Sequence, residues 1–289
     1  MEGQSTHFPL RHRLRVRWAE VDAQQVVFNG HYLTYLDVAI SEYWRAVGLP
    51  YPDAFVQLGG DIFVRQHQLA YSAPARLDDW LDIGLRCERI GNSSIAIAWE
   101  VRCDHRLLVS GQATYVYIDL STGRPQRVPD VVREQIQAHA NGRAVTTVQL
   151  GPWQPLQTQA SNIRRTVFID EQGVPEHEEW DADDANALHA VVRNLAGLPL
   201  ATGRLITQGE PEGQGRIGRM AVIRSARGSG VGAQVLQALI EAAKDKGCQR
   251  LSLHAQCAAM AFYANAGFVP EGGVFDEVGI PHQTMILAL

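Results

Sequence analysis

Two stretches of the chain repeat apolar residues at the spacing of an amphipathic helix. The first runs from Tyr32 to Val47 and keeps an i, i+3, i+4 rhythm for four turns, with Gly48 and Pro50 at its end. The second runs over residues 231–243 and is followed by lysines and by Gly247, a residue type suited to the position after a helix. The pattern therefore predicts two long helices, one in each half of the chain.

Strand patterns follow the first helix in four runs, at residues 62–71, 80–89, 93–103 and 107–119. Ile95, Ile97, Trp99, Val101 and Cys103 alternate strictly with polar or small residues. Residues 121–125 have the composition of a turn and close the last run. The first half is therefore expected to be a helix wrapped by an antiparallel meander.

The two halves are separated by turn-forming residues. Asn141-Gly142 and the prolines at 152 and 155 indicate a boundary, with the linker centred on residues 141–145. We expect domains at residues 1–140 and 146–289, the second beginning with a strand at 146–149 and a helix at 163–172. Further strands are expected at 189–193 and 250–254. No internal repeat is visible, so the halves are different folds.

A glycine-rich loop precedes the second helix. The segment of interest contains Met220, Ala221, Val222, Arg227, Gly228, Ser229, Gly230, Val231 and Gly232. Glycines let a backbone approach a phosphate closely and permit the positive φ angles that turn N–H groups inward. The helix that follows directs its free N–H groups and the positive end of its dipole at the same point. The order of residues predicts a phosphate-binding cradle.

Two familiar phosphate loops do not fit this segment. A nucleotide triphosphatase loop needs Lys and Ser/Thr after its last glycine, and Ala233-Gln234 stand there. A dinucleotide loop should leave its strand directly and meet an acid after the next strand, which here ends in residues 254–256 without one. The remaining pattern, R-x-x-G-x-G from Arg227 to Gly232, resembles motif A of the GNAT acetyltransferases, whose loop holds the pyrophosphate of acetyl-CoA.

The segment after the strand at 250–254 carries a second resemblance to that family. Residues 261–268 read AFYANAGF and are similar to GNAT motif B, in which a tyrosine protonates the leaving thiolate. The resemblance implies that Tyr263 has this role, with acetyl-CoA as cofactor and an amine as acceptor. The alternative for Tyr263 is an aromatic that packs beside Phe262 and Phe268.

The segment before the first helix reads VRWAEVDAQQVVFNGHYL over residues 16–33. It resembles the opening motif of hotdog-fold acyl-CoA thioesterases of the 4-hydroxybenzoyl-CoA type, and the resemblance extends over about residues 10–138. It implies that Asp22 attacks the thioester or activates water while helix N–H groups polarise the carbonyl. The chain is thus expected to be an α+β two-domain protein, a hotdog half followed by a GNAT half of mixed α/β fold. The resemblance also implies a homodimer or homotetramer formed through the hotdog half.

The loop departs from the usual hotdog pattern. Relatives commonly have a glycine three residues after the aspartate and histidines nearby, where this chain has Gln25, Val26 and Asn29. Asp22 could instead satisfy loop N–H groups. For Asn29 we favour a helix N-cap, and His31 is as consistent with a solvent-facing residue as with a catalytic one.

Acyl transfer to an ammonium group also needs a base. The candidates are Glu178, Glu179, His189 and His254, and His282 could line the acceptor pocket. The sequence does not choose among them. Asp181, Asp183 and Asp184 form an acidic cluster that is expected to be a solvated loop, with attraction of an amine substrate as the alternative.

Composition excludes several classes of protein. The formal net charge is −5 and no block of Lys/Arg is present, which argues against nucleic acid or anionic membrane as partners. The first ten residues lack the apolar core of a secretion signal and no run of 18 apolar residues occurs, so we expect a cytoplasmic protein. The four cysteines lack C-x-x-C spacing and are expected to be buried and reduced, and no histidine pattern predicts a metal.

The sequence favours a bifunctional enzyme that combines acyl-CoA thioester hydrolysis with acetyl-CoA-dependent acyl transfer. A second hypothesis keeps the acetyltransferase and makes the hotdog half a dimerising or acyl-CoA-sensing module. A third makes the chain a CoA-binding regulatory protein without turnover.

Overall fold

The computed structural model describes residues 7–289 and separates the chain into two compact units, Met1–Val145 and Thr146–Leu289. The expectation that the chain starts without a secretion signal falls largely on residues 1–6, which lie outside the described part. Within residues 7–289, no helix is both long and apolar enough to cross a membrane.

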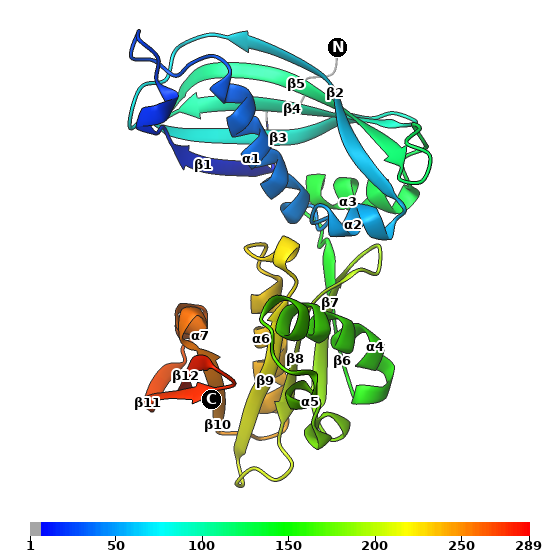
Figure 1. The fold of residues 1–289 in the computed structure, drawn as a ribbon, viewed down its shortest axis with the longest axis vertical. Helices are drawn as coiled ribbons and strands as arrows, with labels where there is room; N and C mark the ends of the chain where they lie inside the picture. The colour runs from blue at the N-terminus through cyan, green and yellow to red at the C-terminus, as the bar shows by residue number, and fades with distance from the viewer. Residues whose placement is uncertain (1–6) are drawn as a thin grey trace. The chain divides into compact units, whose positions relative to one another are not determined.

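The N-terminal unit is a single antiparallel sheet with a helix across one face (Figure 1). Its strands are β1 (Leu10–Arg15), β2 (Gly60–Tyr71), β3 (Trp80–Ile90), β4 (Ser94–Cys103) and β5 (Arg106–Asp119), in the order β1-β3-β4-β5-β2. Its helices are α1 (His31–Ala46), α2 (Asp53–Gln57) and α3 (Asp130–Ala140), with a 3-10 turn at Trp18–Glu20. This confirms the predicted hotdog architecture of a helix wrapped by a meander. It adds β1, in which three exposed arginines alternate with partly buried residues.

The apolar face of α1 explains why the sheet curves around it. Tyr35, Leu36 and Trp44 are almost fully buried, as are Ile97 and Trp99 on β4. Burial of each large side chain contributes about 1.5–3 kcal/mol relative to exposure. The same pattern that predicts the helix therefore also drives its packing on the sheet.

The C-terminal unit is a seven-stranded mixed sheet in the order β11-β12-β10-β9-β8-β7-β6. The strands are β6 (Thr146–Gly151), β7 (Leu188–Asn194), β8 (Pro199–Ile206), β9 (Gln214–Val222), β10 (Arg250–Gln256), β11 (Val269–Glu277) and β12 (Ile280–Ala288). The helices are α4 (Trp153–Arg164), a π-helix (Arg165–Glu171), α5 (Glu176–Glu179), α6 (Val231–Asp245) and α7 (Met260–Ala264). Three 3-10 turns, Ala182–Ala185, Arg224–Ala226 and Cys257–Ala259, complete it.

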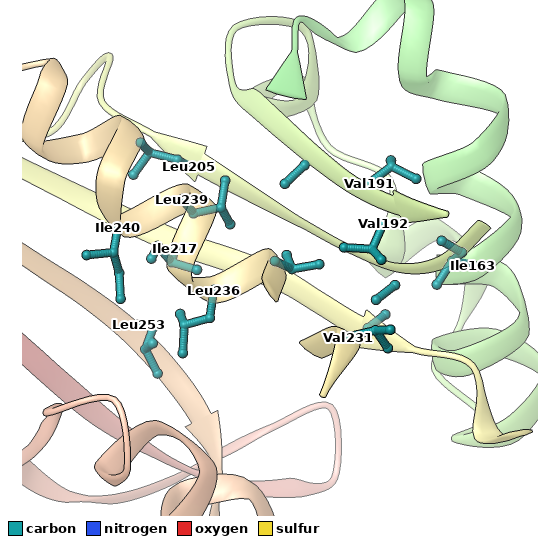
Figure 2. Packing of buried hydrophobic residues seen from close by; sticks show 14 of the residues in the cluster. Ile163, Val191, Val192, Leu205, Ile217, Val231, Leu236, Leu239, Ile240 and Leu253 are labelled. Carbon is teal, nitrogen blue, oxygen red and sulfur yellow. The ribbon is translucent and has the colours of Figure 1, made fainter. Parts of the chain in front are cut away.

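Helix α6 covers the centre of this sheet. Figure 2 shows Leu236, Leu239 and Ile240 of α6 packed near Leu205 of β8 and Ile217 of β9. These side chains belong to one buried cluster. The helix that follows the glycine-rich loop is thereby fixed to the strands that flank the cavity described below.

One expected boundary in this unit is wrong. The first helix begins at Trp153, ten residues before the predicted start at Ile163, and continues as a π-helix to Glu171. Pro155 lies in the first turn, where backbone N–H groups have no partner inside the helix, so a proline is tolerated there. The prolines read as boundary signals stand at a helix start.

The cysteines also differ from expectation. Cys87, Cys103, Cys248 and Cys257 are free thiols, as predicted, but all four are partly accessible instead of buried. Cys87 lies in the second half of β3 and Cys103 is the last residue of β4, where burial along both strands decreases.

Candidate functional site

The glycine-rich loop has the backbone of an anion cradle. Gly228 and Gly230 adopt φ angles of +85° and +84°, and a Cβ atom on either would meet nothing within 4 Å. Gly230 is the N-cap of α6, and no side chain caps that helix. A 15-residue helix with an uncapped start offers N–H groups and a positive dipole end to an anion. The observed conformation therefore fits a pyrophosphate.

Gly232 is needed for close packing and not for a left-handed backbone. A Cβ atom there would lie 3.1 Å from Cγ2 of Val222, so the loop packs closely on the end of β9. Val222 and Ala221 end the strand, and Ala221 and Val231 are buried in the core. Ser229 donates a hydrogen bond from its hydroxyl to the carbonyl of Ala226 at 2.6 Å, which stabilises the turn.

Arg227 does not point freely at this cradle. Its two terminal nitrogens donate to the two carboxylate oxygens of Glu171 at 2.7 Å each, and its Nε donates to the carbonyl of Val222 at 3.2 Å. The hydrogen bond and charge of Arg227 lower the pKa of Glu171. Sequence reasoning did not identify Glu171, because no local pattern links it to a loop 56 residues away.

A cavity of about 520 Å³ opens where two parallel strands separate. β9 and β10 pair only through Gln214–Arg216 and Arg250–Ser252, and they diverge beyond these residues (Figure 1). Met220 of β9 and His254 of β10 line the cavity from its two sides, and Tyr263 of α7 lines it as well. The structure thus brings Met220 and Tyr263, both singled out from the sequence, to one cavity.

Tyr263 is buried, with 8% of its surface exposed. Burial raises the pKa of its hydroxyl to about 12. Phe262 and Phe268 make edge-on ring contacts with it at centroid distances of 4.9 and 6.1 Å. Tyr263 therefore packs against Phe262 and Phe268, as the alternative interpretation expects, and it also reaches the cavity. Its hydroxyl is protonated at neutral pH and can donate a proton.

The candidate bases divide into two groups. Glu179 is buried against the guanidinium of Arg164, at 2.5 Å from its Nε, and His189 is buried with Nε2 2.9 Å from the carbonyl of Asp184. Both are hydrogen-bonded in the interior, and Glu179 also borders the cavity. Glu178 and His254 line the cavity, as does His282.

The expectation that the acidic cluster is a solvated loop is wrong for Asp184, whereas Asp181 and Asp183 remain in contact with solvent. Asp184 is buried and accepts hydrogen bonds from Arg164 at 2.8 Å and from Arg204 at 2.6 Å. Asp181 accepts two bonds of 2.6 Å from Arg204. The sequence does not reveal these partners, because the two arginines come from α4 and β8, which are distant in the chain from the carboxylates that they neutralise. Of the three aspartates, Asp181 lines the cavity, and the guanidinium of Arg204 already balances its charge.

In the N-terminal unit, Asp22 lies in a tight loop before α1. Its carboxylate accepts a hydrogen bond of 2.8 Å from the N–H of Gln24, and its own N–H donates to the carbonyl of Val26 at 2.9 Å. Gln25 adopts a φ of +61°, although it stands where the family's glycine is common. The loop therefore keeps a left-handed residue at this position in spite of the side chain.

Other residues of this loop differ from expectation. The N-cap of α1 is Gly30, so the prediction that Asn29 caps the helix is wrong. Asn29 instead accepts a hydrogen bond from the hydroxyl of Tyr71 on its carbonyl, at 3.1 Å, and lines a cavity of about 300 Å³ with Tyr32 and Tyr71. His31 is partly buried and makes an edge-on contact with Phe28.

Glu20 was not identified from the sequence and holds this loop in place. Its buried carboxylate accepts a 2.7 Å hydrogen bond from the hydroxyl of Tyr35 and another of 2.7 Å from the N–H of Arg17. Burial would raise the pKa of Glu20, but these hydrogen bonds lower it overall. The capping spacing from Arg17 to Glu20 was the available signal.

No group of three or more His, Cys, Asp or Glu side chains is placed to hold a metal ion within residues 7–289.

Comparison with known proteins finds matches to both units. Residues 157–268 match the model of the acetyltransferase (GNAT) family, and residues 16–136 match that of the thioesterase-like superfamily. The N-acetyltransferase YjcF of Bacillus subtilis (strain 168), an uncharacterized protein, is 36% identical over 125 residues, which cover 43% of this chain and 86% of the relative. The protein YyaT of the same strain is 34% identical over 130 residues, covering 44% of this chain and 85% of YyaT.

Solved structures give matches as well. A thioesterase of Thermus thermophilus, crystallised with coenzyme A and Zn, is 28% identical, with a TM-score of 0.41. The match covers 50% of this chain and 99% of that one.

Proposed function

We propose that this chain, which belongs to the GNAT acetyltransferase family through its C-terminal unit and to the thioesterase-like superfamily through its N-terminal unit, transfers an acyl group from acyl-CoA to an amine. One observation carries the transferase proposal. Tyr263 is buried, protonated and lines the cavity between β9 and β10. Its helix α7 follows β10 in the chain, and β9, the parallel partner of β10, leads into the glycine cradle. Acetyl-CoA is the acyl donor that the family uses.

The residues of this unit suit each part of the reaction. The open N–H groups at Gly228 to Gly232 would hold the pyrophosphate, and the edge of β9 at Met220 to Val222 would pair with the amide groups of the CoA arm. The amine attacks the thioester carbon, the carbon–sulfur bond breaks, and the hydroxyl of Tyr263 gives its proton to the departing thiolate. A raised pKa keeps that proton available at neutral pH.

We further propose thioester hydrolysis in the N-terminal unit, with Asp22 as nucleophile or water-activating base. The left-handed conformation at Gln25 supports this role, because the loop that presents the aspartate keeps the bend that a glycine would allow. The hydrogen bond from Gln24 favours the competing structural role of Asp22. A non-catalytic, acyl-CoA-sensing module is the second candidate for this unit.

Assembly into a homodimer or homotetramer is part of the proposal. β2 is a 12-residue edge strand, and Phe63 and Val64 on it are more than half exposed. An edge of this length with apolar side chains is suited to pairing with another strand. A second copy of the chain is the partner that the hotdog resemblance implies.

Free thiol release tests both activities. Acetyl-CoA and longer acyl-CoAs are incubated with wild type, Asp22→Asn and Tyr263→Phe, with and without a panel of primary amines. The proposal expects Tyr263→Phe to lose amine-stimulated release and Asp22→Asn to lose amine-independent release. Hydrolysis that survives Asp22→Asn contradicts the assigned role of Asp22. Stoichiometric CoA binding with no release from any donor or amine in wild type favours a regulatory protein without turnover.

A further inference from the structure

The ring of His282 is held in the wall of the transferase cavity. His282 lies on β12, 9% exposed, and its ring stacks on Phe275 of the neighbouring strand β11 at 6.1 Å between centroids. On its other side β12 pairs with β10, where Gln256 stands opposite His282. Three strands therefore fix the position of this imidazole.

Its hydrogen bond determines which nitrogen carries the proton. Nδ1 of His282 lies 2.8 Å from the carbonyl oxygen of Ile280. A carbonyl oxygen only accepts, so Nδ1 must be the donor and the neutral ring keeps a lone pair on Nε2. Within the described residues, no protein group hydrogen-bonds this Nε2, and His282 lines the cavity that also holds Tyr263.

The other ionisable groups around the cavity are less suited to accept a proton. Glu179 and Asp181 are held by Arg164 and Arg204. His254 is 46% exposed at its side chain, and its Nδ1 lies 3.2 Å from the carboxylate of Glu277, so this nitrogen already has a partner. Glu178 is exposed and pairs with the ring of His177 at 3.5 Å. The cavity arginines, Arg204, Arg216 and Arg219, are each ion-paired to acidic side chains. His282 is buried in the cavity wall, and the lone pair on its Nε2 is not used by another protein group within the described residues.

We propose that His282 is the proton acceptor of the acyl transfer, an inference that rests on the proposed function. Nε2 of His282 takes a proton from the ammonium group of the acceptor, and the neutral amine attacks the thioester carbon. The carbon–sulfur bond breaks and Tyr263 protonates the sulfur. The acylated nitrogen still carries one proton too many and passes it, directly or through water, to the tyrosinate. Water takes the proton from the imidazolium, so that one proton is released for each amide formed.

Amine-stimulated thiol release tests this role when it is followed from pH 5 to pH 9 in wild type, His282→Gln and His254→Gln. The proposal expects His282→Gln to lower kcat/KM for the amine by about 10²-fold or more and to remove the fall in rate on the acid side. His254→Gln should keep that fall. Added imidazole should restore part of the rate of His282→Ala, because it can enter the space of the missing ring.

Nuclear magnetic resonance of the full chain provides a readout that needs no acceptor. Long-range proton–nitrogen correlation should show His282 at pH 8 as the tautomer protonated on Nδ1. A ring protonated on Nε2 overturns the proposal, as does a His282→Gln enzyme that keeps the wild-type pH profile. A wild-type enzyme that no amine stimulates contradicts the proposed transferase function instead, and is thereby distinguished from failure of the His282 assignment.

Discussion

Arg227 and Glu171 are joined by two parallel hydrogen bonds of 2.7 Å, one from each terminal nitrogen of the guanidinium. Arg227 opens the R-x-x-G-x-G motif, and Glu171 ends the π-helix that follows α4. The next residue, Gln172, lines the transferase cavity and accepts a hydrogen bond from Gln256 at 3.0 Å. The positive charge of Arg227 is therefore neutralised by a segment that borders the transferase cavity.

Removal of that carboxylate should strengthen CoA binding. Glu171→Gln removes the negative charge beside the cradle and leaves Arg227 free to meet the pyrophosphate, so we expect CoA to bind about two- to fivefold more tightly. Titration calorimetry with CoA measures the change. Glu241→Gln on the exposed side of α6 is the control for loss of one negative charge. Weaker binding by Glu171→Gln would mean that the carboxylate positions the arginine.

Tyr263→Phe should lower kcat for acyl transfer by about 10²-fold while KM for acetyl-CoA stays nearly constant, because only a proton donor is removed. The hydroxyl's pKa of about 12 has a further consequence. The tyrosine stays protonated throughout the neutral and mildly alkaline range, so its ionisation should cause no loss of rate below about pH 10. A basic-side fall near pH 8 that disappears in Tyr263→Phe would contradict this.

Arg164, the buried arginine beside the acidic cluster, should be important for stability. Arg164 is 1% exposed and bonded to Glu179 and Asp184, so Arg164→Met removes a charged hydrogen-bond donor from each of two buried carboxylates and leaves only their ion pairs with Arg219 and Arg204. We expect a loss of about 3–5 kcal/mol in the free energy of unfolding of the C-terminal unit. Urea denaturation followed by tryptophan fluorescence measures it. Arg165→Met, which breaks the exposed pair with Glu176, is the neighbouring control and should shift the midpoint far less.

Acid should lower the stability that the acidic cluster gives to the C-terminal unit. Burial alone would raise the pKa of Asp181, but the hydrogen bonds and charge of Arg204 outweigh it and lower that pKa to about 2. A lowered carboxyl pKa contributes stability above its unfolded value, which is lost as pH falls from about 4 to about 2. Asp181→Asn should therefore flatten the pH dependence of the unfolding midpoint in this window. An equally steep dependence in the variant would assign it to other carboxylates.

The loop that carries Asp22 can be tested through its left-handed residue. At a φ of +61°, Gln25→Gly should be tolerated, whereas Gln25→Val should cost about 1–3 kcal/mol, because β-branched residues are disfavoured there. Thermal unfolding and thiol release are measured together. Gln24→Val, whose backbone does not have a positive φ, is the control. A stable Gln25→Val protein would show that the loop can adopt another conformation.

The sequence was sufficient where local chemistry determines structure. The period of apolar residues between Tyr32 and Val47 predicts α1 because the helix buries one stripe. The alternation from Ile95 to Cys103 predicts β4, although the intervening Ala96, Ala98 and Glu100 are buried as well. The glycines at 228 and 230 predict the cradle because only they adopt its φ angles without strain. The GNAT resemblance rests on two short segments of this kind, at residues 227–232 and 261–268.

Only the tertiary structure decided which charged groups are available for chemistry. Asp184 and Glu179 looked like free acids, but Arg164 and Arg204 reach them from distant elements. Glu171 meets Arg227 across 56 residues, and His282 reaches Tyr263's cavity because β12 pairs with β10. A carboxylate or imidazole has the same letter in the sequence whether it is paired or open, and its partner is set by long-range packing.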